Sequence, residues 1–95
     1  MGSGVLTVRL RITGCVQGVG YRDWMQRTGA GLGLEGWVRN RRDGSVEAVL
    51  FGPRDVVHRM IEHCRRGPPI AHVAGIEVLD EPSEPPSGFN VLPTI

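Results

Sequence analysis

The sequence predicts an α+β protein in which two helices cover one face of an antiparallel sheet. Two observations support this prediction. Several short runs alternate apolar and polar residues, which is typical of strands with one buried face. Two longer segments between those runs space their apolar residues at the helical period. At 95 residues the chain has room for one domain, residues 1–95, around a single two-layer core.

A strand and a helix are expected first. Residues 5–13 alternate apolar with polar side chains, which predicts a strand with one buried and one solvent-exposed face. Residues 22–32 place Met25, Gly29 and Leu32 on one helical face, with Gly33 as a candidate C-cap. Glycine inside a helix costs about 1 kcal/mol relative to alanine. Because Gly29 and Gly31 both fall there, tertiary packing must support this helix.

A hairpin, a second helix and a fourth strand are expected to follow. Residues 34–40 and 45–51 read as strands joined at Asp43-Gly44, a pair typical of tight turns. The second helix opens after Pro53, continues along an apolar stripe that includes Cys64, and ends at Gly67-Pro68-Pro69. Residues 72–79 read as a fourth strand.

The ends of the chain complete the expected order. Residues 1–4 read as a flexible leader, and the Pro-, Ser- and Glu-rich residues 81–88 as a loop. Residues 89–92 form a short run that can pair at a sheet edge. The order β-α-β-β-α-β is that of the ferredoxin-like, or split β-α-β, sandwich.

The charge balance excludes some classes of function. Eleven basic and ten acidic residues give a net charge of +1, which argues against a nucleic-acid binder and a polybasic membrane anchor. An RNA reader of this fold would expose aromatic side chains on its central strands. Those strands offer mainly Arg9, Arg11, Glu47, Val49 and Phe51 instead. No apolar run approaches the roughly 18 residues of a membrane span. We therefore expect a cytoplasmic monomer without a nucleic-acid or membrane partner.

The cysteines and histidines do not indicate a metal site. Cys15 and Cys64 form no C-x-x-C pair and have no histidine at ligand spacing. Cys64 falls on the apolar stripe and is expected to be buried and reduced, whereas the sequence does not decide whether it pairs with Cys15. His58 and His63 are five residues apart, which points them in different directions on a helix. No metal or other cofactor is expected.

The most informative segment is G-C-V-Q-G-V-G-Y-R at residues 14–22. It joins the first predicted strand to the first predicted helix, where backbone N–H groups converge on anions. Arg22 is a cation at the positive end of the helix dipole, which is unfavourable by about 0.3–1 kcal/mol unless an anion binds there. Two other interpretations remain open: the glycines serve only a tight turn, and Arg22 pairs with an acid such as Asp23.

Two stretches together resemble the acylphosphatase family. The first is residues 14–22, and the second is L-G-L-E-G-W-V-R-N-R-R-D-G-S-V-E at residues 32–47. The resemblance implies the same sandwich and hydrolysis of the carboxyl–phosphate bond of an acyl phosphate. It implies that Arg22 and Asn40 are catalytic, and it places a phosphate-binding backbone at Cys15, Val16, Gln17, Gly18, Val19, Gly20 and Tyr21. The chain departs from the family pattern at Tyr21, where phenylalanine is common, and at Gly29, where alanine is usual.

The residue types suit that chemistry. An acyl phosphate releases a carboxylate, so its hydrolysis needs no general acid and depends on charge stabilisation and a placed water. Arg22 and the loop N–H groups stabilise phosphoryl oxygens, and the amide of Asn40 can hold water. Taken alone, Asn40 also suits a turn. No cluster of Asp and Glu accompanies the loop as a magnesium site would require.

Two alternatives differ in function. A regulatory module that binds phosphate without catalysis would keep the loop but lose Arg22 or Asn40, and this chain has both. The carbamoyl-phosphate-handling unit at the start of a large hydrogenase-maturation protein has similar stretches, but it precedes zinc-type cysteine pairs. The sequence does not identify the acyl group of the substrate.

Overall fold

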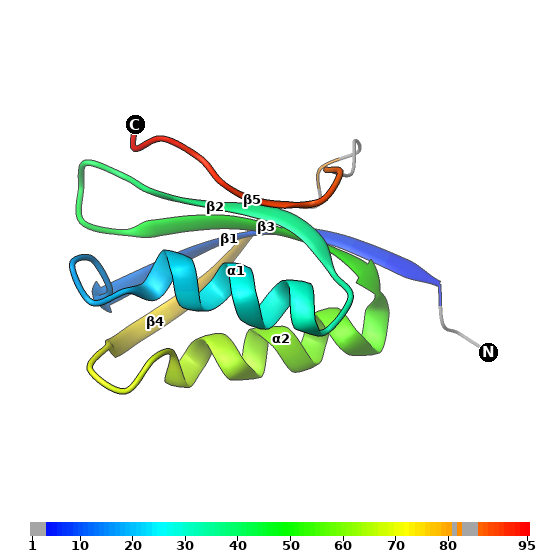
Figure 1. Ribbon diagram of the computed structural model, residues 1–95, viewed down its shortest axis with the longest axis horizontal. Coiled ribbons are helices and arrows are strands. Elements are labelled where there is room, and N and C mark those ends of the chain that lie inside the picture. Colours follow the sequence, from blue (N-terminus) through cyan, green and yellow to red (C-terminus); the bar gives the residue numbers. More distant parts are fainter. Residues whose placement is uncertain (1–3, 81, 83–85) are drawn as a thin grey trace.

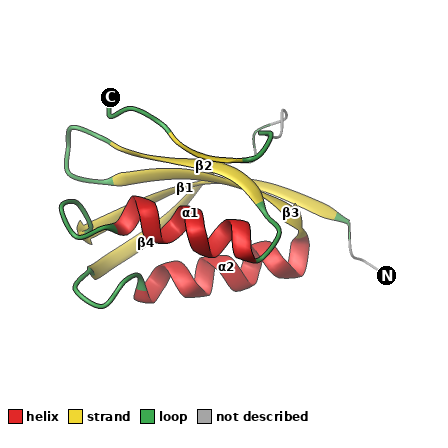
Figure 2. Ribbon diagram, in the orientation of Figure 1, coloured by secondary structure: helices red, strands yellow, loops and turns green. Residues whose placement is uncertain are grey.

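The computed structural model describes residues 4–80, 82 and 86–95. They form two layers, with a single sheet on one side and both helices on the other (Figure 1). Figure 2 shows the same separation of helices from strands. The predicted ferredoxin-like sandwich is therefore confirmed. Among the described residues no helix is long and apolar enough to span a membrane.

The elements follow the predicted order, and the short run expected to pair at a sheet edge forms a fifth strand. They are β1 (Val5–Cys15), α1 (Tyr21–Gly31), β2 (Glu35–Asn40), β3 (Val46–Pro53), α2 (Arg54–Arg66), β4 (His72–Asp80) and β5 (Phe89–Val91). Each boundary lies within two residues of its expected position, because Gly20, Asp43-Gly44 and Gly67 mark the ends of elements in the sequence as well. The predicted leader, apart from Gly4, and most of residues 81–85 lie outside the described residues.

The sheet corrects one prediction. Its strand order is β4-β1-β3-β2-β5, and the first four strands are antiparallel to their neighbours as expected. The fifth strand, β5, pairs with β2 in parallel, with Gly36 opposite Phe89, so the sheet is mixed. The physical reason is direction: β5 at one edge of the sheet runs opposite to β4 at the other edge. Strand β2, the neighbour of β5, also runs opposite to β4.

The core lies between the sheet and the helices. Leu10, Ile12 and Leu50 from the sheet are fully buried against Met25 of α1 and Met60 of α2. This packing fixes α1 along the sheet. The start of α1, the β2–β3 turn and the C-terminus lie at the same end of the sandwich (Figure 1). The two segments singled out in the sequence therefore meet in space.

Candidate active site

The loop between β1 and α1 owes its conformation to two glycines. Gly18 has a φ of +75° and Gly20 a φ of +79°, both in the left-handed region that favours glycine. Gly20 is the N-cap of α1, and its carbonyl oxygen accepts a hydrogen bond from the N–H of Trp24 at 3.0 Å. The loop therefore enters the helix through a turn that a side chain at Gly20 would strain.

The loop leaves its backbone donors available. Within the described residues, no main-chain N–H from Val16 to Asp23 donates a hydrogen bond to a protein acceptor. These donors lie at the N-terminus of an 11-residue helix, where the dipole favours negative charge. A loop of this kind is suited to hold an anion.

Arg22 and Asn40 share one pocket of about 100 Å³. The pocket is lined by Val16, Gly18, Gly20, Tyr21, Arg22, Asp23 and Asn40. Arg22 comes from the first turn of α1, and Asn40 from the last position of β2. In the part of the chain that the structure describes, Arg22 makes no side-chain hydrogen bond or ion pair, so its suggested pairing with Asp23 is not present.

The side chain of Asn40 is not used for a turn. Its Oδ1 is buried and has no hydrogen-bond partner in the described residues, which costs about 1–3 kcal/mol unless a donor reaches it. Its main chain is fixed instead, because the carbonyl oxygen accepts the N–H of Ile95 at 3.2 Å. Next to it, the N–H of Arg41 donates to the carbonyl of Ser45 at 2.9 Å and closes the hairpin.

Three of the predicted loop residues do not line the pocket with their side chains. Cys15 is exposed at the end of β1, and Val19 is partly buried against the core. Gln17 points to the hairpin, where its Nε2 donates to the carbonyl oxygens of Arg41 at 2.7 Å and Ser45 at 2.8 Å. The sequence does not predict this link, since nothing in the chain order pairs Gln17 with a turn that begins 24 residues later.

Tyr21 contributes to the site mainly by anchoring it. Its ring is buried, and its hydroxyl donates to the carbonyl of Cys64 at 2.7 Å. That carbonyl is in the last turn of α2 and would normally accept from the residue four positions on, which is Pro68 and has no N–H. Burial raises the pKa of Tyr21 far above its usual value, so the hydroxyl stays a donor.

The two thiols differ in environment and are both free. Cys64 is fully buried, and burial raises the pKa of its thiol to about 12. Cys15 is exposed. The expectation of a buried, reduced Cys64 is confirmed, and this structure has no bond between the two cysteines.

Among the described residues, this site combines loop N–H groups that have no protein acceptor with Arg22 and the unpaired amide oxygen of Asn40, a set that suits a protein that handles small phosphate compounds. A sequence profile of the acylphosphatase family matches residues 8–91. An acylphosphatase from Rhizorhabdus wittichii is 52% identical over 92% of this chain and 88% of its own length. One from Azoarcus sp. strain BH72 is 55% identical over 90% and 87%. The crystal structure of acylphosphatase from Bacillus subtilis superposes with a TM-score of 0.85, at 34% identity, over 92% of this chain and 98% of that one.

The chain belongs to the acylphosphatase family. It is a hydrolase that cleaves the carboxyl–phosphate bond of acyl phosphates. The resemblance inferred from residues 14–22 and 32–47 is thereby confirmed, and the family membership favours an enzyme over a silent phosphate-binding module.

Proposed function

We propose that Arg22 and the loop hold the phosphoryl group of the substrate while Asn40 holds the attacking water. The loop contribution is assigned to the backbone of Cys15, Val16, Gln17, Gly18, Val19, Gly20 and Tyr21. The observation that carries this proposal is the shared pocket, in which Arg22 faces the same space as Asn40, whose Oδ1 lacks a partner.

The loop and Arg22 divide the electrostatic task. Asp23 adds a negative charge to the same pocket wall, so the charge of Arg22 alone does not make the site positive. The unpartnered loop N–H groups must therefore contribute to binding the phosphoryl oxygens. The planar guanidinium of Arg22 adds a bidentate contact, which strengthens as charge develops on those oxygens.

The amide of Asn40 positions the attacking water for the reaction. Its Oδ1 accepts a hydrogen bond from the attacking water, which turns an oxygen lone pair of the water toward phosphorus. The new P–O bond forms as the bond to the acyl oxygen breaks, and the carboxylate leaves with that electron pair. The attacking water passes a proton to the phosphate product or the solvent. The leaving carboxylate needs no proton, so no general acid is required.

We also propose a metal-independent enzyme that acts as a monomer in the cytoplasm on a small acyl phosphate, without a nucleic-acid or membrane partner. The near-neutral net charge of +1 supports the absence of a nucleic-acid or membrane partner, and the carboxylate leaving group supports metal independence. Benzoyl phosphate hydrolysis should be unchanged in excess EDTA, whereas a strict requirement for magnesium would contradict the proposal.

The decisive experiment separates binding from chemistry at Asn40. Asn40→Ala should lower kcat by roughly a hundredfold, the scale of losing one placed polar group in a transition state. Inhibition by inorganic phosphate should stay within a few-fold of wild type, since Arg22 and the loop are untouched. Asn90→Ala is the matched control, because Asn90 is exposed on β5 and its side chain donates, among the described residues, only to the carbonyl of Ser87, at 3.2 Å.

Loss of phosphate affinity in a folded Asn40→Ala protein would make Asn40 a substrate ligand and overturn the water role. An unchanged thermal midpoint establishes that the variant is folded. Full activity in Asn40→Ala would remove the residue from the mechanism.

A further inference from the structure

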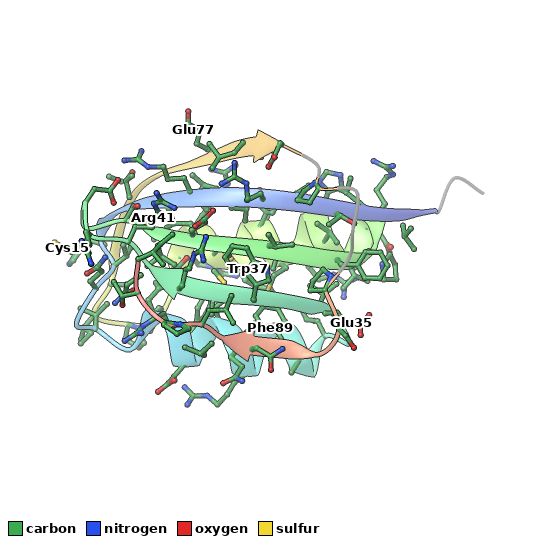
Figure 3. All side chains as sticks on the ribbon, turned by 90° about the horizontal axis from the view of Figure 1, so that it is seen from above. Cys15, Glu35, Trp37, Arg41, Glu77 and Phe89 are labelled. Carbon is green, nitrogen blue, oxygen red and sulfur yellow. The ribbon has the colours of Figure 1, made fainter. Side chains whose placement is uncertain are left out.

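The sheet face opposite the helices carries a buried carboxylate that does not line the candidate active site. Glu47 lies on β3 and is 2% exposed, although its place in the alternating pattern predicts a solvent-exposed side chain. Its Oε2 accepts from Arg9 at 2.6 Å, and its Oε1 accepts from Arg39 and Arg41, each at 2.9 Å. Figure 3 looks onto this face, with Arg41 at the hairpin end of the sheet.

These contacts are stronger constraints than the exposed ion pairs of the same face. Burial alone would raise the pKa of Glu47, but the three guanidinium groups hold the pKa below its usual value. The carboxylate is therefore ionised at neutral pH, and it accepts short, charge-assisted hydrogen bonds away from water. The pair between Arg11 and Asp43 is exposed on both sides, a type that contributes little to holding two side chains together.

Two of the three arginines flank Asn40 in the chain. Arg39 precedes it and Arg41 follows it, and we call their contacts with Glu47 the flanking ion pairs. Side chains alternate between the two faces of a strand, so Asn40 points to the other side of the sheet, where it lines the pocket with Arg22. One carboxylate oxygen therefore holds the chain on both sides of the residue to which the proposed function assigns the water.

The main chain of Asn40 lies at the end of a strand. The pairing of β2 with β5 stops at Val38, whereas Asn40 pairs with Val46 of β3 and is the last residue of β2. On the side of β5 its carbonyl oxygen accepts the N–H of Ile95 at 3.2 Å, at the long end of the hydrogen-bond range. Strand ends open more easily than strand centres. The flanking ion pairs therefore add a side-chain constraint where main-chain pairing ends.

We propose that Glu47 is a positioning residue for the hydrolysis. Through the flanking ion pairs it fixes the end of β2, so that Oδ1 of Asn40 holds the attacking water in line with the bond that breaks. This inference rests on the water role proposed for Asn40. Since Glu47 lies on the face opposite the pocket, it should affect kcat and leave the binding of phosphate to Arg22 and the loop unchanged.

The first variant is Glu47→Gln, which keeps the size of the side chain and one oxygen acceptor but removes the charge. Its kcat for benzoyl phosphate, per folded molecule, should fall about tenfold, because a small displacement of a positioned group slows the chemical step. The folded fraction is measured by circular dichroism. Inhibition by inorganic phosphate should stay within a few-fold of wild type.

The arginines provide a matched comparison around the same carboxylate. Arg41→Gln should lower kcat about fivefold, less than Glu47→Gln because one flanking ion pair remains. It is a cleaner change than Arg39→Gln, since Arg39 also lies over the ring of Trp37 at 4.7 Å. Arg9→Gln also removes a guanidinium from Glu47, but Arg9 comes from β1 and flanks no residue of the site, so kcat should stay within about twofold.

Coupling to Asn40 separates positioning from a general effect on stability. In a protein that already carries Asn40→Ala, adding Arg41→Gln should leave the remaining kcat within about twofold, because no amide is left to position. A merely structural role would lower kcat by the same factor in both backgrounds.

Three results would overturn the role of Glu47. They are an unchanged kcat in folded Arg41→Gln, an equal loss in Arg9→Gln, and a full loss from Arg41→Gln in the Asn40→Ala background. If Glu47→Gln does not fold, Arg41→Gln carries the test, because its side chain reaches the surface.

The failure of this inference differs from the failure of the proposed function. Full activity in Asn40→Ala would refute the water role and, with it, the positioning role of Glu47. Low activity in Asn40→Ala together with full activity in Arg41→Gln would refute only the positioning role.

Discussion

The side-chain amide of Gln17 donates from Nε2 to the carbonyl oxygen of Arg41 at 2.7 Å. The same nitrogen also donates to the carbonyl of Ser45 at 2.8 Å. Gln17 belongs to the loop proposed to hold phosphate, and Arg41 directly follows Asn40. This one amide therefore ties the phosphate loop to the strand end that carries Asn40.

Gln17→Ala should lower kcat about tenfold, because the two halves of the site lose a connection that sets their relative position. The KM for benzoyl phosphate should change less than kcat, since Arg22 and the loop N–H groups remain. The measurement is steady-state kinetics. Gln26→Ala is the control: Gln26 donates in the same way to the carbonyl of Phe89 at 2.9 Å, outside the pocket, and its loss should leave kcat within twofold. Equal kinetic effects of both variants would mean that Gln17 acts only through stability.

Arg22→Lys should reduce kcat/KM by about a hundredfold or more, because lysine retains the charge but loses the planar fork. Inhibition by inorganic phosphate should weaken as well, in contrast to Asn40→Ala. Arg27→Lys provides the comparison on the same helix, since Arg27 is exposed and does not line the pocket. Near-full activity of Arg22→Lys would disprove the proposed bidentate contact between Arg22 and the phosphoryl group.

Tyr21→Phe should destabilise the protein by about 1–2 kcal/mol, because it leaves the Cys64 carbonyl in the last turn of α2 without a donor. Activity per folded molecule should stay within twofold of wild type. Urea unfolding at pH 7 measures the first expectation and kinetics the second. Unchanged stability would mean that water donates to the Cys64 carbonyl in place of the Tyr21 hydroxyl.

Stability should also fall at alkaline pH. Burial raises the pKa of both Tyr21 and Cys64 in the folded state, so the unfolded chain releases their protons first. Their contribution is complete below the unfolded pKa values of about 8.5 for cysteine and 10 for tyrosine, and it is lost as the pH rises above them. The thermal midpoint should be flat from pH 7 to 8 and decline above pH 9. The decline of the thermal midpoint above pH 10 should be shallower in Tyr21→Phe than in the wild type. If the two proteins show the same pH profile, the decline is due to groups other than Tyr21.

The fold follows closely from the sequence because its signals are local. The alternation of apolar and polar residues predicted which face of β1 is buried, and the apolar stripe predicted the buried face of α2. The direction of β5 was not predictable, because three residues carry no period and their pairing depends on which edge the chain reaches. The environment of Glu47 was missed for a related reason. Alternation placed it on the open face, but arginines from β1 and β2 and the hairpin cover it there.

The candidate site shows the same division. Arg22, Asn40 and the glycine loop were predicted from short stretches, and the structure places them around one pocket. The contact of Gln17 with the hairpin was not, because it depends on how two loops meet at one end of the sandwich. Local sequence identifies the groups, whereas the distances between them come from packing.

The two glycines of α1 give a last prediction in which the same substitution has opposite effects. Helix propensity alone expects alanine to stabilise both positions by up to about 1 kcal/mol. At Gly29 the structure contradicts this, because an added Cβ would overlap the ring of Phe89 on β5. At Gly31 an added Cβ would meet nothing within 4 Å.

Gly29→Ala should therefore destabilise the protein by about 1–3 kcal/mol, the usual cost of overpacking a filled core. Gly31→Ala should be neutral or stabilising by about 0.5 kcal/mol, since it lies exposed at the end of the helix. Urea unfolding of both variants measures the difference. In a protein that already carries Phe89→Ala, adding Gly29→Ala should cost little further stability, because the ring that the new Cβ would overlap is gone. If the two single variants have equal stability, the departure at Gly29 from the usual alanine owes nothing to Phe89, and the packing of β5 onto α1 does not select glycine.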